Sequence, residues 1–332
     1  MPRIVRFHET GAPEVMRIEQ LPAREPAEGE LRIAVRAIGL NRAEAMFRAG
    51  QYLESPVLPS ALGYEAAGLV DAVGPGVSGF TVGQPVSTIP AFSMTRYGMY
   101  GDTVMAPAFA CVAHPESLAF DKAAAAWMQY LTAWGALHQI AGLKAGDTVL
   151  IPAATSSVGL AAIQICRAAG ATPIALTRTE VKRQALMEAA PGTEIVVTEQ
   201  QDLVAETMRL TGGKGARIAF DPVGGPTVEK LVAALSQGGV LFQYGALSTE
   251  PTPLPLFPLL GKQLTIRGYT LFEITQSRER LAAGKRYVLD GLASGALDPV
   301  IARHFPFEEV VEAHRFMESN AQVGKIVLTL PG

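Results

Sequence analysis

The sequence predicts an α/β protein in which a doubly wound, parallel six-stranded sheet is inserted into a mainly antiparallel β domain. Two observations predict this arrangement. The first third of the chain is strand-rich and full of turn signals, whereas helical and strand-like segments alternate from Asp121 to Tyr269. The segment after Tyr269 has too few elements for a third domain, so we expect it to return to the first. The predicted division is residues 1–122 and 270–332 for a catalytic domain and residues 123–269 for a Rossmann domain.

The first domain shows the period-2 pattern of half-buried strands. Residues 30–37 alternate polar and apolar side chains, and residues 66–73 form a second short β segment. Glycines at positions 63, 68, 74, 76, 79 and 83 separate such segments, which is typical of turns in an antiparallel sheet.

In the second domain six apolar segments predict the parallel strands, and helical patterns lie between them. The first helix is expected over residues 122–141. The strands are expected at residues 148–151, 172–176, 195–197, 218–220, 240–244 and 264–269, and the helices between them at 158–169, 181–190, 203–210 and 227–236. After Tyr269 we expect a helix over 278–293, a short strand near Val300, a helix over 307–317 and a closing strand over 325–330.

Composition limits the classes of protein. Apolar residues make up 48% of the 332 residues and charged residues 18%, with a net charge of −3, so a basic nucleic-acid or membrane surface is not expected. The two cysteines, Cys111 and Cys166, exclude a disulfide framework and favour a reducing compartment. No signal-peptide pattern follows Met1, and the most apolar stretches, 123–137 and 253–260, are too short for a membrane span. A cytoplasmic location is expected.

The strand over 148–151 runs into a stretch of small and hydroxyl residues and then a helix. A dinucleotide pyrophosphate binds at such a helix N-terminus, where free N–H groups and the helix dipole favour anions. Of the three glycines of the usual fingerprint only Gly159 is present, with Ala154 and Ser156 in the other two places. Thr155, Ser156 and Ser157 can donate from their hydroxyls. An ordinary capped helix is the alternative, but the six-strand alternation favours a dinucleotide.

The end of the second strand distinguishes the two nicotinamide dinucleotides. NAD-binding proteins carry an acidic residue there, whereas a basic residue accommodates the 2′-phosphate of NADPH. Here the strand ends in Thr177-Arg178, and Lys182 follows one turn later. A solvated surface arginine is the alternative interpretation; the guanidinium nevertheless favours NADPH over NADH.

The sequence offers no pattern of metal ligands. The five histidines stand at positions 8, 114, 138, 304 and 314, and none has the spacing to another His, Cys or carboxylate that a zinc site needs. Catalysis by a metal ion is therefore not expected.

Several motifs occur in an order that resembles the medium-chain dehydrogenase/reductase superfamily over essentially the whole chain. They lie at residues 39–52, 62–74, 130–134, 158–164, 220–225 and 324–328. The closest resemblance is to the zinc-independent quinone oxidoreductases and the 2-enoyl thioester reductases, and it implies a GroES-like catalytic domain. In zinc-dependent members a Cys and a His stand where this chain has Asn41 and Tyr64.

The resemblance also implies roles for individual residues. Tyr52 corresponds to a proton donor of enoyl reductases, although a half-buried turn tyrosine is an equal alternative. Gln129 and Met46 depart from relatives, which often have Asn and Tyr there. The cofactor-binding residues expected from the motifs and the resemblance are Asn41, Gln129, Thr132, Thr155, Ser156, Ser157, Val158, Thr177, Arg178, Lys182, Tyr244, Gly245, Ala246, Tyr269, Thr270, Leu271 and Lys325.

These observations predict an enzyme that passes a hydride from NADPH to a small quinone or an α,β-unsaturated carbonyl compound. A 2-enoyl thioester reductase is the alternative enzyme, and a nicotinamide-binding structural or regulatory protein with little turnover is the alternative of another class. The last strand of the parallel sheet, 264–269, is expected at an exposed edge, so we expect a homodimer.

Overall fold

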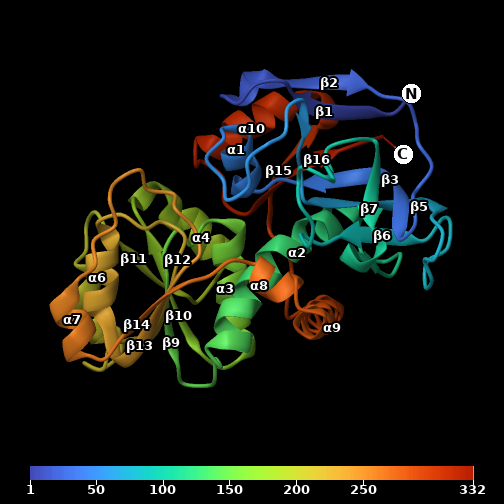
Figure 1. The fold of residues 1–332 in the computed structure, drawn as a ribbon. Coiled ribbons are helices and arrows are strands. Elements are labelled where there is room, and N and C mark those ends of the chain that lie inside the picture. The colour runs from blue at the N-terminus through green and yellow to red at the C-terminus, as the bar shows by residue number, and fades with distance from the viewer. Residues whose placement is uncertain (332) are drawn as a thin grey trace. The chain divides into compact units, whose positions relative to one another are not determined.

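The computed structural model describes residues 1–331 and divides the chain into two compact units. The first unit comprises Met1–Met128 together with the chain from Ile301 onward, and the second comprises Gln129–Val300. Each unit has its own β-sheet, and Figure 1 labels the helices and strands of both.

The first unit is built on a mainly antiparallel sheet of seven strands. Its longest strand, β3 (Glu30–Gly39), pairs antiparallel with β5 (Glu65–Val73), and buried and half-buried residues alternate through the middle of β3, as the period-2 pattern predicts. The strand order is β15-β16-β3-β5-β6-β8, and β7 also pairs with β3. The remaining strands are β6 (Pro85–Thr88), β7 (Thr103–Pro107), β8 (Cys111–Ala113), β15 (Ile301–Pro306) and β16 (Lys325–Thr329).

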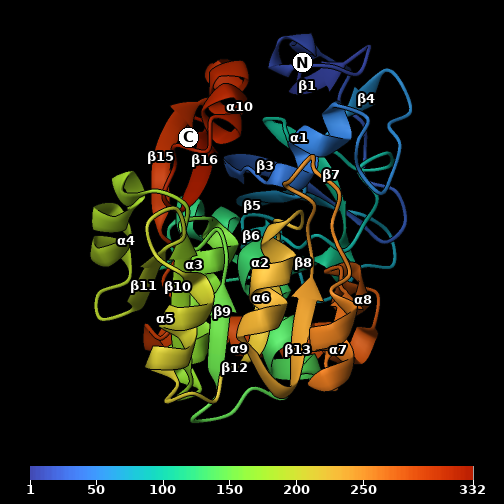
Figure 2. The same cartoon turned by 90° about the vertical axis from the view of Figure 1, so that its left-hand side faces the viewer.

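A smaller sheet and several short helices complete this unit. The sheet has the order β2-β1-β4, formed by β1 (Arg3–Phe7), β2 (Met16–Gln20) and β4 (Ser60–Ala61). The helix α10 (Val310–Glu318) packs beside β15 and β16 and contacts α1 (Arg42–Arg48) (Figure 2). The short 3-10 turns are η1 (Pro13–Val15), η2 (Ala108–Ala110) and η5 (Phe307–Glu309).

The second unit contains a six-stranded sheet of order β11-β10-β9-β12-β13-β14 in which every pairing is parallel. The strands are β9 (Thr148–Ile151), β10 (Thr172–Thr177), β11 (Glu194–Val197), β12 (Ala216–Asp221), β13 (Leu235–Gln243) and β14 (Thr265–Gly268). The order reverses between β9 and β12, which is the switch point where doubly wound sheets bind ligands. The predicted fold, a doubly wound parallel sheet with a mainly antiparallel β domain, is confirmed.

Helices cover both faces of this parallel sheet, with α3 on one face and α6 on the other (Figure 1). They pack on it through apolar side chains, as α6 does with Val228, Leu231 and Val232. The helical elements that belong to this unit or enter it are α2 (Phe120–Trp134), η3 (Gly135–Ile140), α3 (Ser157–Ala168), η4 (Glu180–Lys182), α4 (Arg183–Ala189), α5 (Leu203–Leu210), α6 (Thr227–Ala234), α7 (Leu256–Gly261), α8 (Phe272–Thr275) and α9 (Arg278–Ser294). Among residues 1–331, no helix is both long enough and apolar enough to cross a membrane.

Several helices differ from those the sequence predicts. The helix expected over 122–141 changes at Gly135 from α to π geometry, where a Cβ would lie 2.2 Å from the Tyr269 hydroxyl. The helix expected over 227–236 ends at Ala234, because Leu235 already begins β13. The helix α7 was not predicted, since its apolar stretch contains prolines that interrupt a helical pattern.

Candidate active site and cofactor site

The loop between β9 and α3 has the geometry expected of a pyrophosphate site. Ser156 is the N-cap of α3, and its hydroxyl accepts a hydrogen bond of 3.0 Å from the Gly159 backbone nitrogen. A Cβ on Gly159 would lie 2.7 Å from the Cα of Ala154, so the helix can approach the loop this closely only with glycine there. The predicted residues lie at the start of this twelve-residue helix: Thr155 precedes it, Ser156 caps it, and Ser157 and Val158 begin its first turn.

The end of β10 carries the predicted cations. The Arg178 side chain is 82% exposed, and its Nε lies 3.7 Å from a carboxylate oxygen of Glu199, so this ion pair is loose. Lys182 instead reaches the neighbouring loop, where its Nζ donates to the Thr155 hydroxyl over 3.3 Å. Thr177 is the last residue of β10 and is buried. The structure therefore brings Lys182 to the loop after β9 and leaves the Arg178 guanidinium facing solvent.

Sequence reasoning missed Glu199, which follows β11. Its backbone nitrogen donates to the Arg178 carbonyl over 3.2 Å, which holds the carboxylate beside the guanidinium. The available signal was an acidic residue just after the strand that pairs with β10, because parallel neighbours end at the same edge of the sheet.

Six of the other predicted residues of the second unit follow β13 or β14, at the same carboxyl edge of the sheet as the loops after β9 and β10, whereas Gln129 and Thr132 lie in α2. The Tyr244 ring stacks on Phe220 with centroids 4.0 Å apart, and a Cβ on Gly245 would lie 2.6 Å from the Pro222 carbonyl oxygen. Tyr269 is buried and its hydroxyl donates to the Leu131 carbonyl over 3.5 Å. The remaining members of the predicted set are Ala246 and Thr270, which are exposed, and Gln129, Thr132 and Leu271, which are buried.

Tyr52 is half-buried in the loop after α1 of the first unit. Burial raises the pKa of its phenol, and a hydrogen bond with the Tyr64 side chain partly opposes that increase. The loop is fastened two residues further on, where Glu54 accepts hydrogen bonds from the Ser93 hydroxyl and the Thr95 backbone nitrogen. Tyr52 is therefore protonated at neutral pH and held in place, as a proton donor must be.

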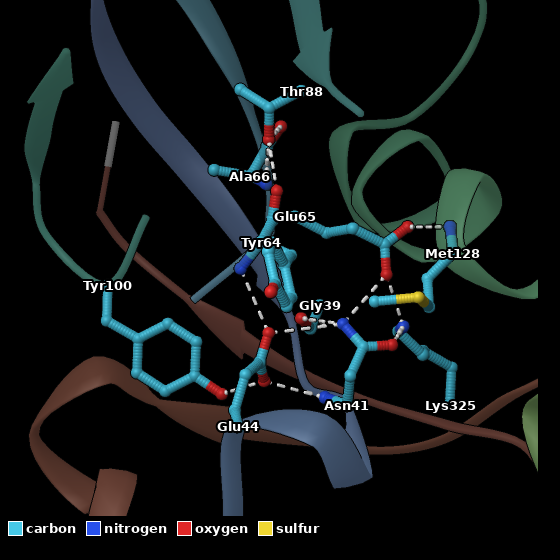
Figure 3. A network of polar contacts seen from close by, with 10 residues as sticks. All are labelled: Gly39, Asn41, Glu44, Tyr64, Glu65, Ala66, Thr88, Tyr100, Met128 and Lys325. Carbon is cyan, nitrogen blue, oxygen red and sulfur yellow. Dashed lines mark hydrogen bonds and ion pairs between the residues drawn. The ribbon is translucent and has the colours of Figure 1, made fainter. Parts of the chain in front are cut away.

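Asn41 and Lys325, which are far apart in sequence, meet in a buried polar network of the first unit (Figure 3). The Lys325 Nζ donates to Asn41 Oδ1 over 2.6 Å and forms an ion pair with Glu65 in which both side chains are fully buried. Glu44 accepts hydrogen bonds from the Asn41 backbone nitrogen over 2.7 Å and from the Tyr100 hydroxyl over 2.6 Å. The structure thus joins two of the predicted residues and adds two glutamates.

Sequence reasoning assigned no role to Glu44 or Glu65. Glu44 had a readable signal, because Asn41 and Glu44 have the spacing of a capping box at the start of a helix. Glu65 had no such local signal, because Lys325, the residue with which it forms an ion pair, lies 260 positions away in the sequence.

Within residues 1–331 no three or more His, Cys, Asp or Glu side chains group in a way that could hold a metal ion. The buried His314 is engaged instead by Arg48, whose Nη1 lies 2.7 Å from its Nδ1, and by the Tyr100 hydroxyl at 3.2 Å from its Nε2. Burial and the neighbouring cations Arg48 and Arg42 lower the pKa of His314 to about 3.

Comparison with known proteins agrees with this architecture. A model of the alcohol dehydrogenase GroES-like domain matches residues 27–153, and a model of the zinc-binding dehydrogenase family matches residues 157–284. Quinone oxidoreductase 1 of Escherichia coli is 31% identical over 98% of both chains, and 2-haloacrylate reductase of a Burkholderia species is 31% identical over 97% of both. A crystal structure of E. coli quinone oxidoreductase complexed with NADPH is 30% identical, with a TM-score of 0.90 over 99% of this chain and 100% of that chain.

The chain belongs to the medium-chain dehydrogenase/reductase superfamily. Within the superfamily it falls in the quinone oxidoreductase branch, and it is an oxidoreductase. The family and the GroES-like first domain that the motifs led us to expect are confirmed. The roles of the individual site residues stay predictions, because no comparison addresses them residue by residue.

Proposed function

We propose that this medium-chain dehydrogenase/reductase transfers a hydride from NADPH to a small quinone or α,β-unsaturated carbonyl compound without zinc. The observation that carries the proposal is the cationic group at the carboxyl edge of the parallel sheet. There the Lys182 ammonium donates a hydrogen bond to Thr155, in the loop after β9. Arg178 directly follows the neighbouring strand β10 and has an exposed guanidinium. The E. coli relative whose structure contains NADPH and the relative that is a 2-haloacrylate reductase support it.

The residues of the second unit fit a phosphorylated dinucleotide. Gly159 and Gly245 sit where a side chain would collide with backbone, so α3 packs closely on the loop after β9, as in a dinucleotide-binding turn, and Gly245 packs closely on Pro222. The N-terminus of α3 offers N–H groups to a pyrophosphate, and no acidic residue occupies positions 176–179 to repel a 2′-phosphate. We assign the dinucleotide phosphates to residues 155–158, Thr177, Arg178 and Lys182.

For the nicotinamide we assign residues of each unit separately. From the first unit these are Asn41 and Lys325, and from the second they are Gln129, Thr132, Tyr244, Gly245, Ala246, Tyr269, Thr270 and Leu271. NADPH, when bound, supplies the hydride. In the zinc-dependent members Cys and His hold the metal where this chain has Asn41 and Tyr64; here Asn41 is bonded to Lys325, which supports a zinc-independent reaction.

The proposed acid is Tyr52. When a hydride adds to the β-carbon of a conjugated carbonyl, negative charge develops on the carbonyl oxygen and must be stabilised and protonated. Tyr52 keeps its proton at neutral pH, because burial raises its pKa. A positioned general acid contributes about 10²–10⁴ in rate. A quinone depends less on this acid, since orientation alone supplies much of the acceleration.

Steady-state assays test the proposal. With NADPH, the enzyme should reduce a simple benzoquinone and a short enone, with kcat/KM at least about tenfold higher than with NADH. An enoyl-CoA is included because a strong preference for it would make the protein a 2-enoyl thioester reductase. Binding of NADPH without consumption across the acceptors would instead identify a structural or regulatory protein with little turnover.

We propose a homodimer that forms along β14. This strand is at the end of the six-stranded order, and an edge strand offers unpaired N–H and C=O groups to a second copy. Next to it lie large apolar side chains with high exposed fractions, Leu256 at 56%, Phe257 at 90% and Leu260 at 71%. Light scattering at micromolar concentration should give a dimer, and Phe257→Glu should shift it towards monomer. A monomeric wild type would contradict this assembly.

We also propose a cytoplasmic location, because the two buried cysteines, Cys111 and Cys166, form no disulfide within residues 1–331, as expected in a reducing compartment.

A further inference from the structure

The amide of Asn41 is surrounded by charges that permit one orientation (Figure 3). Its Oδ1 accepts from the Lys325 ammonium over 2.6 Å, and its Nδ2 donates to Glu65 over 3.0 Å and to Glu44 over 3.2 Å. An amide oxygen only accepts and an amide nitrogen only donates. A flipped amide would place N–H against the ammonium and oxygen against two carboxylates, so the network fixes which atom faces which way.

Burial of the Lys325 ammonium is energetically costly. Its side chain and that of Glu65 are both fully buried, and taking two charges out of water is unfavourable unless the ion pair and its hydrogen bonds are well formed. The second Glu65 oxygen accepts a hydrogen bond from the Met128 backbone nitrogen over 2.8 Å, so both carboxylate oxygens have a donor. A Cβ on Gly39 would lie 2.9 Å from the Lys325 Cε, so the bare glycine leaves the space that the lysine stem needs.

The backbone of Asn41 is fixed as well. Asn41 caps α1, and Glu44 accepts from its backbone nitrogen over 2.7 Å while also accepting from the Tyr64 backbone nitrogen and the Tyr100 hydroxyl. Burial raises the pKa of Glu44, and these donors oppose that increase. Asn41 is therefore held at its main chain by Glu44 and at its amide by Lys325 and Glu65.

We propose that Lys325 and Glu65 are positioning residues for the Asn41 amide, so that the role assigned to Lys325 at the nicotinamide is exerted through this amide and not by direct contact. The proposal rests on the proposed function, which assigns Asn41 to the nicotinamide. Its structural basis is that the Lys325 side chain is fully buried and that two of the three ammonium N–H groups bond Asn41 and Glu65.

A double-mutant cycle on NADPH affinity, measured by the fluorescence of the bound dinucleotide, tests whether Lys325 acts through Asn41. We expect Asn41→Ala and Lys325→Met each to raise the dissociation constant about tenfold, and the double variant to raise it no further, because both remove the same contact. Glu308→Gln, which removes an exposed ion pair with Arg3 in the same unit, is the matched control and should leave the affinity unchanged. A double variant weakened about a hundredfold would show independent contacts and overturn the proposal.

Glu65→Gln provides a second test with a volume-conserving change. It removes the carboxylate that pairs with the buried Lys325 ammonium and that accepts from the Asn41 amide over 3.0 Å. The NADPH dissociation constant should therefore rise about tenfold, and Glu65→Gln combined with Asn41→Ala should bind NADPH no more weakly than Asn41→Ala alone. A double variant that is about tenfold weaker than Asn41→Ala contradicts the positioning role of Glu65.

Thermal unfolding without cofactor separates this proposal from the proposed function. Glu65→Gln leaves a buried ammonium without its carboxylate, so the melting temperature should fall, and adding Lys325→Met should recover much of that loss. If this occurs but neither the wild type nor any variant binds NADPH, the proposed function fails. If NADPH binds and the double variants are weaker than Asn41→Ala, the positioning proposal fails.

Discussion

Arg178→Ala isolates the group that we propose distinguishes NADPH from NADH. The guanidinium is 82% exposed and has a loose ion pair with Glu199 at 3.7 Å, so its removal leaves no buried charge unpaired and should not affect folding. The ribose of NADH carries a hydroxyl where that of NADPH carries a phosphate. The substitution should therefore weaken NADPH and leave NADH nearly unchanged.

The magnitude follows from the exposure of the site. Two opposite charges 4 Å apart attract by about 1 kcal/mol in water and about 4 kcal/mol near a protein surface of lower effective dielectric. Because Arg178 is mostly in water, we take about 1–2 kcal/mol, which corresponds to a roughly 5- to 30-fold rise in the NADPH dissociation constant. Salt should reduce this difference, since screening acts strongly on exposed charges.

Fluorescence titration with both dinucleotides, at low and at high salt, measures the effect. Glu199→Gln is the matched control, because it removes the carboxylate that competes for the same guanidinium. It should strengthen NADPH binding about two- to fivefold and leave NADH unchanged. Equal weakening of both dinucleotides in Arg178→Ala, or no weakening of NADPH, would refute the assignment of Arg178 to the 2′-phosphate.

Three further changes test other parts of the account. Tyr52→Phe should lower kcat for enone reduction about 10²–10⁴-fold with little change in NADPH affinity, and unchanged turnover would remove Tyr52 from the mechanism. Gly159→Ala forces a Cβ to 2.7 Å from the Ala154 Cα and should weaken NADPH more than tenfold in the same titration, whereas Gly261→Ala, with open space around it, should not. His314 has a pKa of about 3 in the folded protein and 6.5 when unfolded, so it is neutral in the native state and the free energy of unfolding decreases as the pH falls below about 6.5. Between pH 7.5 and pH 5 this decrease amounts to about 2 kcal/mol, measured by urea unfolding. His314→Gln should lack that part of the pH dependence.

The sequence predicted the parallel sheet well because each strand there is a local signal. The strand Thr148–Ile151 and the helix Leu203–Leu210 match their predicted bounds, since buried strands and amphipathic helices have distinct periods that read without knowledge of the tertiary structure. Boundaries failed where tertiary contacts decide them. The change from α to π geometry at Gly135 coincides with the close approach of Tyr269, which is far along the chain.

The candidate site divides in the same way. The loop 155–158 and Arg178 could be predicted because strand ends and helix starts mark the phosphate sites of a doubly wound sheet. The contact of Lys325 with Asn41 and Glu65 could not be derived locally, because the position of Lys325 on the sheet depends on the antiparallel pairing of β16 with β3. Glu199 was missed for a related reason, since only the register of β10 with β11 places it beside Arg178.

Hydride transfer itself can be followed with NADPH that carries deuterium at C4, prepared in both stereochemical forms, and a short enone as acceptor. The account predicts that one of the two forms delivers deuterium to the β-carbon of the saturated product, detected by mass spectrometry and NMR, while the α-hydrogen comes from solvent. A product without deuterium from either form, or no consumption of NADPH with any quinone or enone, would contradict it.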